Sequence, residues 1–299
     1  MYIQESEKHD EEAIKYAGIE KLLRTIEATG KKYDVEKIKK AYLFAKKLHE
    51  GQYRYSGEEY ISHPVAVAEI VASLELDTDS LCAALLHDTL EDCGSKVSLE
   101  EIKREFGDDV ASLVDGLTKL VQIPIEDKEE QHIENLRKMF LAMSKDVRVI
   151  FIKLCDRLHN MRTLGVKKDS KRRITSLETM QVFAPLAHRL GMQRIKQELE
   201  NLSLLYLDPY GYEEVKTDIE KKYGESREFL EEARTKLADK LTSSGIKFTL
   251  EGRVKSVYSI YRKMYEQNKS FDQIYDFYAL RVIVDTVEEC YLVLGLIHD

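Results

Sequence analysis

The sequence lacks several features that would each define a class of protein. No uninterrupted apolar run approaches the ~20 residues that a membrane-spanning helix needs, so we expect no membrane span. The first twelve residues are polar and acidic, unlike a signal peptide. The four cysteines form no C-x-x-C pair, and three lie in apolar helical patterns, which indicates buried free thiols in a reducing cytoplasm. No internal repeat or low-complexity tract is found.

The composition is that of a helix-rich globular protein. Hydrophobic residues make up 43% and charged residues 33% of 299 residues, enough for one large domain or two ordinary ones. The net charge of −8 argues against general nucleic-acid binding. The charge is uneven, however: between Lys236 and Lys269 there are eight basic residues and only three acidic ones.

Helical periodicity dominates the first 240 residues. We expect Ser62 to cap a helix that has Pro64 in its first turn, and Ser98 with Glu101 to begin another as a capping box. The long charged helix near 210–241 is interpreted as a solvated surface or connecting helix. The predicted helices are two within 10–50, separated near Gly30, and then 64–74, 79–93, 98–107, 108–121, 126–145, 146–164, 170–190, 193–206 and 210–241.

The pattern changes after Ser243-Ser244-Gly245. Residues 246–252 alternate like a strand, 257–265 are helical, 279–285 are a second strand candidate, and a last helix begins near 286. The prediction is a mainly α protein, all-helical at first and α/β afterwards. Two strands in about 60 residues are too few for an independent core, so the second part is interpreted as an incomplete domain.

The stretch Leu85–Asp92 concentrates the most chemistry. It follows a buried apolar run and carries His87, Asp88, Glu91 and Asp92 on what the periodicity predicts to be a single helix. One imidazole and three carboxylates at the end of a buried segment are unfavourable unless a cation or substrate balances their charge. This crowding predicts a metal site.

Two residues from other helices complete a candidate ligand set. His63 precedes a proline at a helix start, and Asp156 lies in a helix with Asn160 one turn later. Taken singly, each is more simply a capping or salt-bridged residue. Together with His87 and Asp88 they form a mixed imidazole and carboxylate set, which suits Mn²⁺, Fe²⁺ or Zn²⁺ better than Ca²⁺.

This order of residues resembles the HD superfamily of metal-dependent phosphohydrolases. Longer strings resemble one branch of it, the hydrolase domain of the RelA/SpoT (Rel) family, which acts on the alarmone (p)ppGpp. The matching strings are Arg54–Glu58, Tyr60–Pro64, Leu86–Asp92 and Lys153–Thr163. The resemblance implies domains at 1–200 (hydrolase), 201–240 (helical connector) and 241–299 (a truncated part of the synthetase domain).

The resemblance also implies roles for individual residues. His63, His87, Asp88 and Asp156 would hold one Mn²⁺, and Glu91 and Asp92 would be the catalytic acidic pair that acts on the attacking water. Arg54, Ser56, Asn160 and Thr163 resemble the nucleotide-contacting residues. The implied reaction removes the 3′-pyrophosphate and gives GDP or GTP plus pyrophosphate. Glu59 and Tyr55 depart from the usual proline and lysine, which affects the base pocket rather than the metal site.

The basic stretch near the C-terminus resembles the opening of the Rel synthetase domain. Arg253, Lys255 and Lys263 would match its ATP-phosphate contacts, and Asp276 its Mg²⁺ ligand. By composition alone, an amphipathic basic helix and a strand are the simpler interpretation. The family's later synthetase motifs are absent, so no synthetase activity is expected from this chain.

Two alternatives to a (p)ppGpp hydrolase remain open. One is another HD-family nucleotide phosphohydrolase, which the loop from Arg54 to Ser56 disfavours. The other is a non-catalytic nucleotide-binding regulatory module, which Glu91 and Asp92 disfavour. The expected partners are ppGpp and pppGpp in the cytoplasm, with no membrane and no nucleic acid. Ribosome contact would need the family's C-terminal domains.

Overall fold

Helices form nearly all of the secondary structure in this computed structural model, which describes residues 16–119, 145–274 and 276–298. The mainly α prediction is confirmed. The helix predicted over 126–145 lies outside the described residues except for its last position. The chain divides into two compact units, Met1–Lys196 and Gln197–Asp299.

The first unit is a helical bundle. Its elements are η1 (Ala17–Ile19), α2 (Glu20–Ala28), α3 (Val35–Leu48), α4 (Ser62–Ser73), α5 (Thr78–Leu86), α6 (Thr89–Asp92), α7 (Leu99–Phe106), α8 (Asp108–Lys119), α10 (Arg148–Arg162), η2 (Leu164–Val166), α11 (Asp169–Glu178), the π-helical η3 (Thr179–Phe183) and α12 (Ala184–Arg189). Helix α13 (Gln193–Leu207) begins in this unit and continues into the second.

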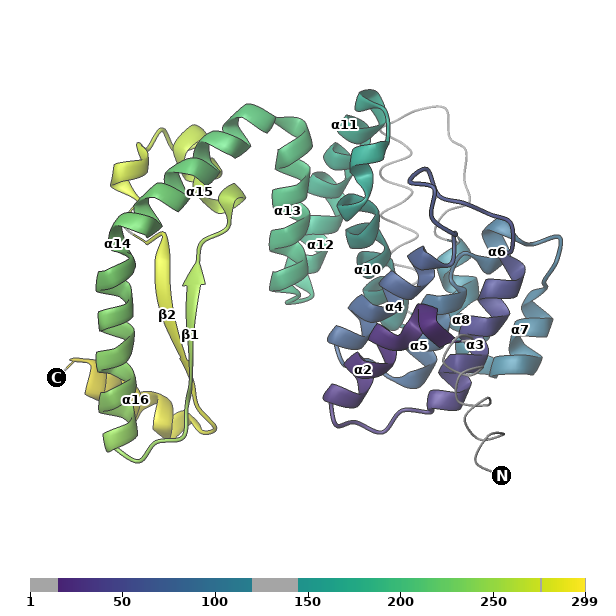
Figure 1. Ribbon diagram of the computed structural model, residues 1–299, viewed down its shortest axis with the longest axis horizontal. Helices are drawn as coiled ribbons and strands as arrows, with labels where there is room; N and C mark the ends of the chain where they lie inside the picture. The colour runs from purple at the N-terminus through teal and green to yellow at the C-terminus, as the bar shows by residue number, and fades with distance from the viewer. Residues whose placement is uncertain (1–15, 120–144, 275, 299) are drawn as a thin grey trace, which may run out of the picture. The chain divides into compact units, whose positions relative to one another are not determined.

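Helices α4 and α5 form the centre of the bundle. Helix α4 packs against α2, α5 and α10, and α5 packs against α3 and α8 as well (Figure 1). Both are apolar nearly all round, as a helix surrounded by other helices must be. Every residue of α5 from Ser80 to Leu86 is buried. The apolar start of α10, which could be mistaken for a strand, is helical as predicted.

Side-chain caps fix where several helices begin. Asp34 accepts the Lys37 amide at 3.0 Å at the start of α3. Ser98, the cap residue of the predicted capping box, accepts the Glu101 amide at 3.2 Å at the start of α7. Ser62 is not the cap of α4. It is the first helical residue, because the preceding backbone already turns and leaves Ile61 in the helical region.

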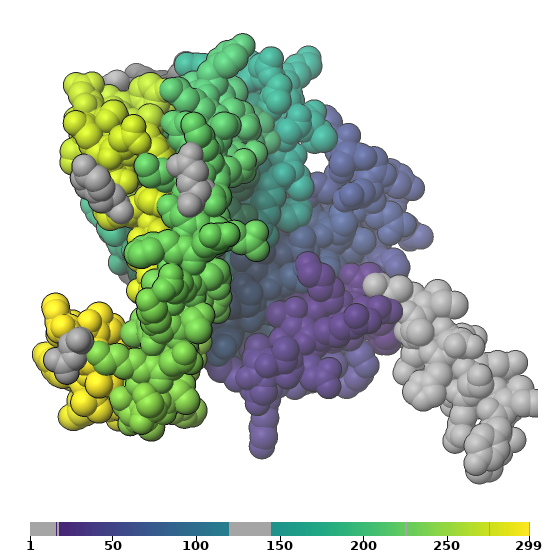
Figure 2. Space-filling view, turned by 60° about the vertical axis from the view of Figure 1, so that its left-hand side comes forward, coloured from purple at the N-terminus to yellow at the C-terminus, as the bar shows by residue number. Residues whose placement is uncertain are grey.

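The second unit is built on the long helix α14 (Pro209–Ser243). The other elements are β1 (Thr249–Val254), α15 (Val257–Tyr265), η4 (Phe271–Gln273), β2 (Tyr278–Ile283) and α16 (Val287–His298). Strands β1 and β2 pair antiparallel, with Thr249 opposite Ile283 and Val254 opposite Tyr278. Figure 2 shows α14 in green, with α15 near one end and α16 near the other.

Helix α14 is not only a solvated connector. Val215 and Ile219 pack with Ile260 and Ile274 at one end, and Leu241 packs with Ile246 and Val293 at the other. The last of these contacts also explains why β1 begins three residues later than predicted. Ile246 is used as a core residue before strand pairing starts at Thr249.

Among the described residues, no helix combines the length and the apolar character that crossing a membrane requires.

Candidate metal centre

The stretch that the sequence singled out is not one helix. The helix predicted from Asp79 to Cys93 is wrong at its centre, because α5 ends before His87 and α6 begins after Asp88. The one-turn spacing of Asp88 and Asp92 is kept, since the Asp92 amide donates to the Asp88 carbonyl at 2.8 Å. His87 and Asp88 nevertheless form a corner, a two-residue break between the two helices.

Local hydrogen bonds account for the corner. The Nδ1 atom of His87 lies 2.8 Å from the carbonyl oxygen of Ala84, and the Thr89 hydroxyl donates to the carbonyl of Leu86 at 2.6 Å. Side chains that bond helix carbonyls in this way compete with continuation of the backbone ladder.

Four side chains from three places in the chain meet at this corner. The Nε2 atom of His63 lies 3.2 Å from Asp156 Oδ1 and 3.6 Å from Asp88 Oδ2. The Nε2 atom of His87 lies 3.0 Å from Asp88 Oδ1 and 3.8 Å from Asp156 Oδ1. Ligating atoms of His63, His87 and Asp88 all lie within 4.8 Å of one another. The structure thus brings together all four predicted metal ligands.

The two imidazoles are oriented by partners on their outer nitrogens. The bond from His87 Nδ1 to the Ala84 carbonyl requires the proton on Nδ1, so the neutral ring has its lone pair on Nε2. That Nε2 atom is buried and faces the carboxylates of Asp88 and Asp156. The Nδ1 atom of His63 lies 2.7 Å from Nδ1 of His159 in the same way. Metal-ligating histidines are usually fixed by an outer partner of this kind.

The two carboxylates have outer partners too. The Tyr60 hydroxyl donates to Asp88 Oδ2 at 2.8 Å. Asp156 accepts from Lys153 Nζ at 2.8 Å and from the Asn160 side-chain amide at 2.6 Å. Each carboxylate is therefore held in one orientation, with its remaining acceptor capacity directed at the imidazoles.

Burial and charge shift the protonation of these groups strongly. Burial would lower the pKa of His87, but Asp88 and Asp156 outweigh it and raise this pKa to about 9. Burial lowers the pKa of His63. Although burial opposes their ionised forms, the pKa values of Asp88 and Asp156 are lowered, by His87 in the first case and Lys153 in the second. Two ionised carboxylates thus surround two nitrogen donors.

These residues fit a divalent cation. Without a metal, the two buried carboxylates are balanced in part by a proton on His87, whose Nε2 lies 3.0 Å from Asp88 Oδ1. A divalent cation at the same place would replace that proton and accept the lone pair of the nitrogen. Two imidazoles and two carboxylates form the mixed nitrogen and oxygen set that first-row divalent metals prefer. The site can hold one such ion through His63, His87, Asp88 and Asp156.

The predicted acidic pair lies beside this centre on α6. The side chains of Glu91 and Asp92 are exposed. Partial desolvation and the charge of Asp88 raise the pKa of Glu91, while Lys153 opposes the shift. A carboxylate with a raised pKa is a better proton acceptor near neutral pH.

The predicted nucleotide residues separate into two groups. Arg54 donates from Nη2 to the Thr163 hydroxyl at 3.2 Å, and its Nη1 is buried without a partner. These two residues form one candidate contact surface. Asn160 instead bonds Asp156, so its amide group supports the metal centre. Ser56 is exposed in the loop that begins at Arg54.

The second predicted cluster is partly assembled in the second unit. Lys255 and Lys263 both pair with Asp276, the latter at 2.9 Å from Oδ1. These two ammonium groups lower the pKa of Asp276 to about 2. Arg253 is exposed on β1, opposite Ala279, and is not part of these ion pairs.

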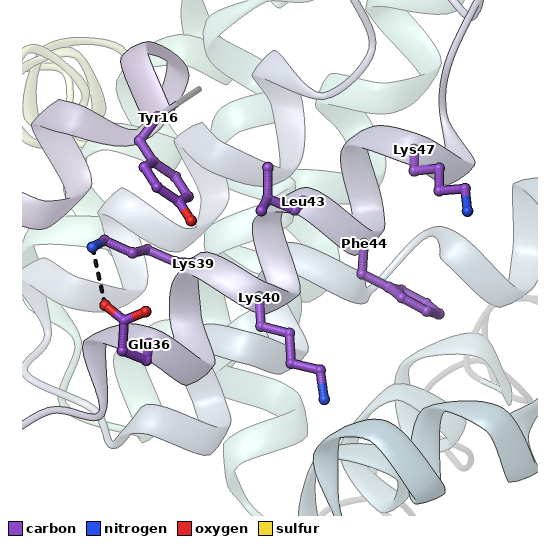
Figure 3. Close-up of a pocket in the computed structure, with 7 residues that line it drawn as sticks. All are labelled: Tyr16, Glu36, Lys39, Lys40, Leu43, Phe44 and Lys47. Atoms are coloured by element: carbon purple, nitrogen blue, oxygen red, sulfur yellow. Dashed lines mark hydrogen bonds and ion pairs between the residues drawn. The ribbon is translucent and has the colours of Figure 1, made fainter. Parts of the chain in front are cut away.

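A separate hollow of about 350 Å³ lies on the outer face of α3 and contains none of the predicted site residues. Figure 3 shows the side chains that line it, which are Tyr16, Glu36, Lys39, Lys40, Leu43, Phe44 and Lys47. Lys39 pairs with Glu36 at 3.0 Å, and Lys40 pairs with Glu105 at 3.1 Å. Two of its three lysines are therefore already neutralised, which makes it a poor candidate for phosphate binding.

Sequence reasoning gave no role to three side chains that touch the centre, namely Tyr60, Lys153 and His159. Their spacing in the sequence could have indicated this. Tyr60 lies three residues before His63, and Lys153 and His159 lie three residues before and after Asp156, which is about one helical turn in each case. A residue at that spacing from a ligand is a natural candidate for its outer partner.

Comparison with known proteins agrees with this fold. The HD domain family matches residues 41–193, about half of the chain, and the chain belongs to this family. Residues 252–299 match the region found in RelA / SpoT proteins. The resemblance seen in the sequence is thus confirmed, and the chain is an HD-domain protein of the RelA/SpoT type.

Curated relatives carry names that describe alarmone metabolism. A Haemophilus influenzae guanosine-3′,5′-bis(diphosphate) 3′-pyrophosphohydrolase is 46% identical over 86% of this chain and 38% of its own length. The Escherichia coli bifunctional (p)ppGpp synthase/hydrolase SpoT is 45% identical over 89% and 38%. A Brucella melitensis GTP pyrophosphokinase is 43% identical over 87% and 34%. The chain spans little more than a third of the length of these relatives.

Proposed function

We propose that this chain hydrolyses the 3′-pyrophosphate of ppGpp and pppGpp, giving GDP or GTP plus pyrophosphate, with Mn²⁺ as its metal. The observation that carries the proposal is the convergence of His63, His87, Asp88 and Asp156 next to Glu91. The names of the relatives support the choice of substrate.

The metal centre prepares the reaction. A divalent cation held there supplies Lewis acidity, which lowers the pKa of water and offsets charge on the phosphoryl group. Glu91, and Asp92 with it, accept the proton of the attacking water, for which the raised pKa of Glu91 is suited. The water oxygen bonds to the phosphorus nearest the ribose, the bond from that phosphorus to the 3′-oxygen breaks, and the 3′-oxygen takes up a proton.

Arg54, Ser56 and Thr163 would bind the nucleotide. The unpartnered Nη1 of Arg54 is a buried donor with a fixed direction, since Nη2 is already bonded to Thr163. A forked donor of this kind can bind phosphate oxygens or the edge of guanine. Asn160 would act through Asp156 as well as on the substrate.

The test is product analysis with the purified chain. Incubation of ppGpp with Mn²⁺ should release GDP and pyrophosphate in equal amounts, and a chelator should abolish the release. Turnover of cyclic or deoxynucleotides in preference to ppGpp would favour another HD phosphohydrolase. Binding of ppGpp without release of pyrophosphate would favour a regulatory module.

Two kinds of variant separate metal binding from proton transfer. His87→Ala or Asp88→Ala should lose metal and activity together, because each removes a ligand. Glu91→Gln should retain the metal and lose activity, because the amide cannot accept the proton. Normal hydrolysis by Glu91→Gln would show that the catalytic assignment is wrong.

We propose that residues 1–200 form the hydrolase domain, 201–240 a helical connector and 241–299 a partial synthetase domain. The ion pairs of Asp276 with Lys255 and Lys263 support this assignment of the last segment. Because the family's later synthetase motifs are absent, we expect no (p)ppGpp after incubation of this chain with ATP and GDP, and its appearance would contradict the proposal. The free cysteines Cys82, Cys93, Cys155 and Cys290 support a cytoplasmic location.

A further inference from the structure

Tyr60 contacts the metal centre on two sides. Its hydroxyl donates to Asp88 Oδ2 at 2.8 Å, and its ring meets the edge of His63 with centroids 6.2 Å apart. The hydroxyl also lies within hydrogen-bonding reach of Asp92. One side chain therefore restrains a metal ligand while facing a member of the acidic pair.

His49 holds the ring of Tyr60 from behind. The two rings stack with centroids 4.6 Å apart and an interplanar angle of 23°. His49 is only 3% exposed, and its Nδ1 lies 2.7 Å from Gln52 Oε1. The amide of Tyr60 donates to the carbonyl of Gln52 at 3.0 Å, which closes the loop between these residues.

The same imidazole also contacts the end of α6. Cys93, the residue after Asp92, is 2% exposed, and its Sγ lies 3.6 Å from His49 Nδ1. That thiol also donates to the carbonyl of Leu48 at 3.4 Å. His49 therefore lies between the tyrosine that restrains Asp88 and the residue that ends the helix of the acidic pair.

We propose that Tyr60 and His49 are positioning residues of the metal centre. The Tyr60 hydroxyl holds Asp88 in its ligating orientation, and His49 holds the Tyr60 ring in place through stacking. The inference rests on the proposed function only in requiring a divalent ion at the four ligands. Loss of an outer partner of a metal ligand typically weakens metal binding or activity about 10- to 100-fold.

The first experiment measures the affinity of the protein for Mn²⁺ without any nucleotide. Tyr60→Phe keeps the ring and removes only the hydroxyl, and it should weaken Mn²⁺ binding about 10- to 100-fold. The electron paramagnetic resonance spectrum of the bound Mn²⁺ should also change. Tyr42→Phe is the matched control, because Tyr42 is a buried tyrosine of α3 outside the centre. Equal Mn²⁺ affinity in both variants would overturn the proposal.

A double-mutant cycle tests whether His49 acts through the tyrosine. His49→Ala should weaken Mn²⁺ binding about 10-fold, and the double variant should bind no worse than Tyr60→Phe within a factor of ~3. Losses that simply multiply would exclude this role for His49. Thermal melting of each variant without metal is the control for stability. A variant that is destabilised as a whole would melt at a lower temperature than the wild type.

These readouts remain separate from the proposed reaction. If the wild-type chain binds Mn²⁺ and leaves ppGpp intact, the proposed function fails while the positioning role can still be tested. If Mn²⁺ does not bind the wild-type chain, both fail.

Discussion

The pair of Lys153 and Asp156 gives a prediction whose size can be derived from the structure. Their atoms lie 2.8 Å apart, and the two side chains are only 19% and 7% exposed. Lys153→Met removes the ammonium group at nearly constant volume and leaves Asp156 charged and buried. Removing one partner of a buried pair typically costs about 3–5 kcal/mol. The low end, about 3 kcal/mol, is expected here because Asn160 still donates to Asp156.

The assay is thermal melting with a chelator and then with excess Mn²⁺. At about 2–4 °C per kcal/mol for a unit of this size, the metal-free Lys153→Met variant should melt roughly 6–12 °C below the wild type. Mn²⁺ should close most of this gap, because the cation then balances Asp156. Lys119→Met is the control: it breaks an exposed pair with Asp115 at 2.5 Å and should cost under ~1 kcal/mol.

Two results would refute this reasoning. The metal-free Lys153→Met variant is expected to melt far below the Lys119→Met control, so equal melting temperatures would show that Asp156 does not depend on the lysine. A gap that stays the same with Mn²⁺ would show that the ion does not bind next to Asp156.

Three further predictions concern other parts of the first unit. Arg54→Lys cannot keep the forked geometry and should raise KM for ppGpp about 10-fold, measured by steady-state kinetics, with a smaller change in kcat. Asp77→Ala should cost about 1 kcal/mol in urea unfolding at pH 7, because Asp77 accepts the Ser80 amide at 2.9 Å and caps α5. Although burial opposes it, the bonds from Ser80 and Arg148 lower the pKa of Asp77. The stabilisation by Asp77 is therefore complete above the unfolded-state pKa of about 4 and is lost as pH falls through the lower folded-state pKa. A difference in unfolding free energy between wild type and Asp77→Ala that persists at pH 2 would contradict the assignment. Leu85→Ala, at a position with no exposed surface, should cost about 2–5 kcal/mol in the same assay, and a cost under 1 kcal/mol would contradict its place in the core.

The sequence predicted which side chains converge at the proposed metal centre better than it predicted the local backbone. His63, His87, Asp88 and Asp156 could be assembled from matching strings, because residue identity at a metal site is tightly restricted by coordination chemistry. The corner at His87 could not be predicted from apolar periodicity, since it depends on two side chains that bond helix carbonyls.

Other differences also arise from contacts that a linear pattern does not contain. The late start of β1 follows from packing of Ile246 against α14 and α16. The role of Asn160 changes because its amide reaches Asp156 within the same helix. His49 lies fourteen residues before His63, so its position behind Tyr60 emerges only when the intervening loop folds back.

The corner between α5 and α6 has an electrostatic consequence for ion selectivity. The peptide dipoles of a helix add to a partial negative charge of about half a unit at its carboxyl end. The carboxyl end of α5 lies directly at His87, and nearly the whole helix is buried, so little water screens that charge. The backbone itself therefore favours a cation over an anion at this point. A variant that lost one carboxylate ligand would still present a negative potential, and it should bind metal weakly rather than bind phosphate in its place.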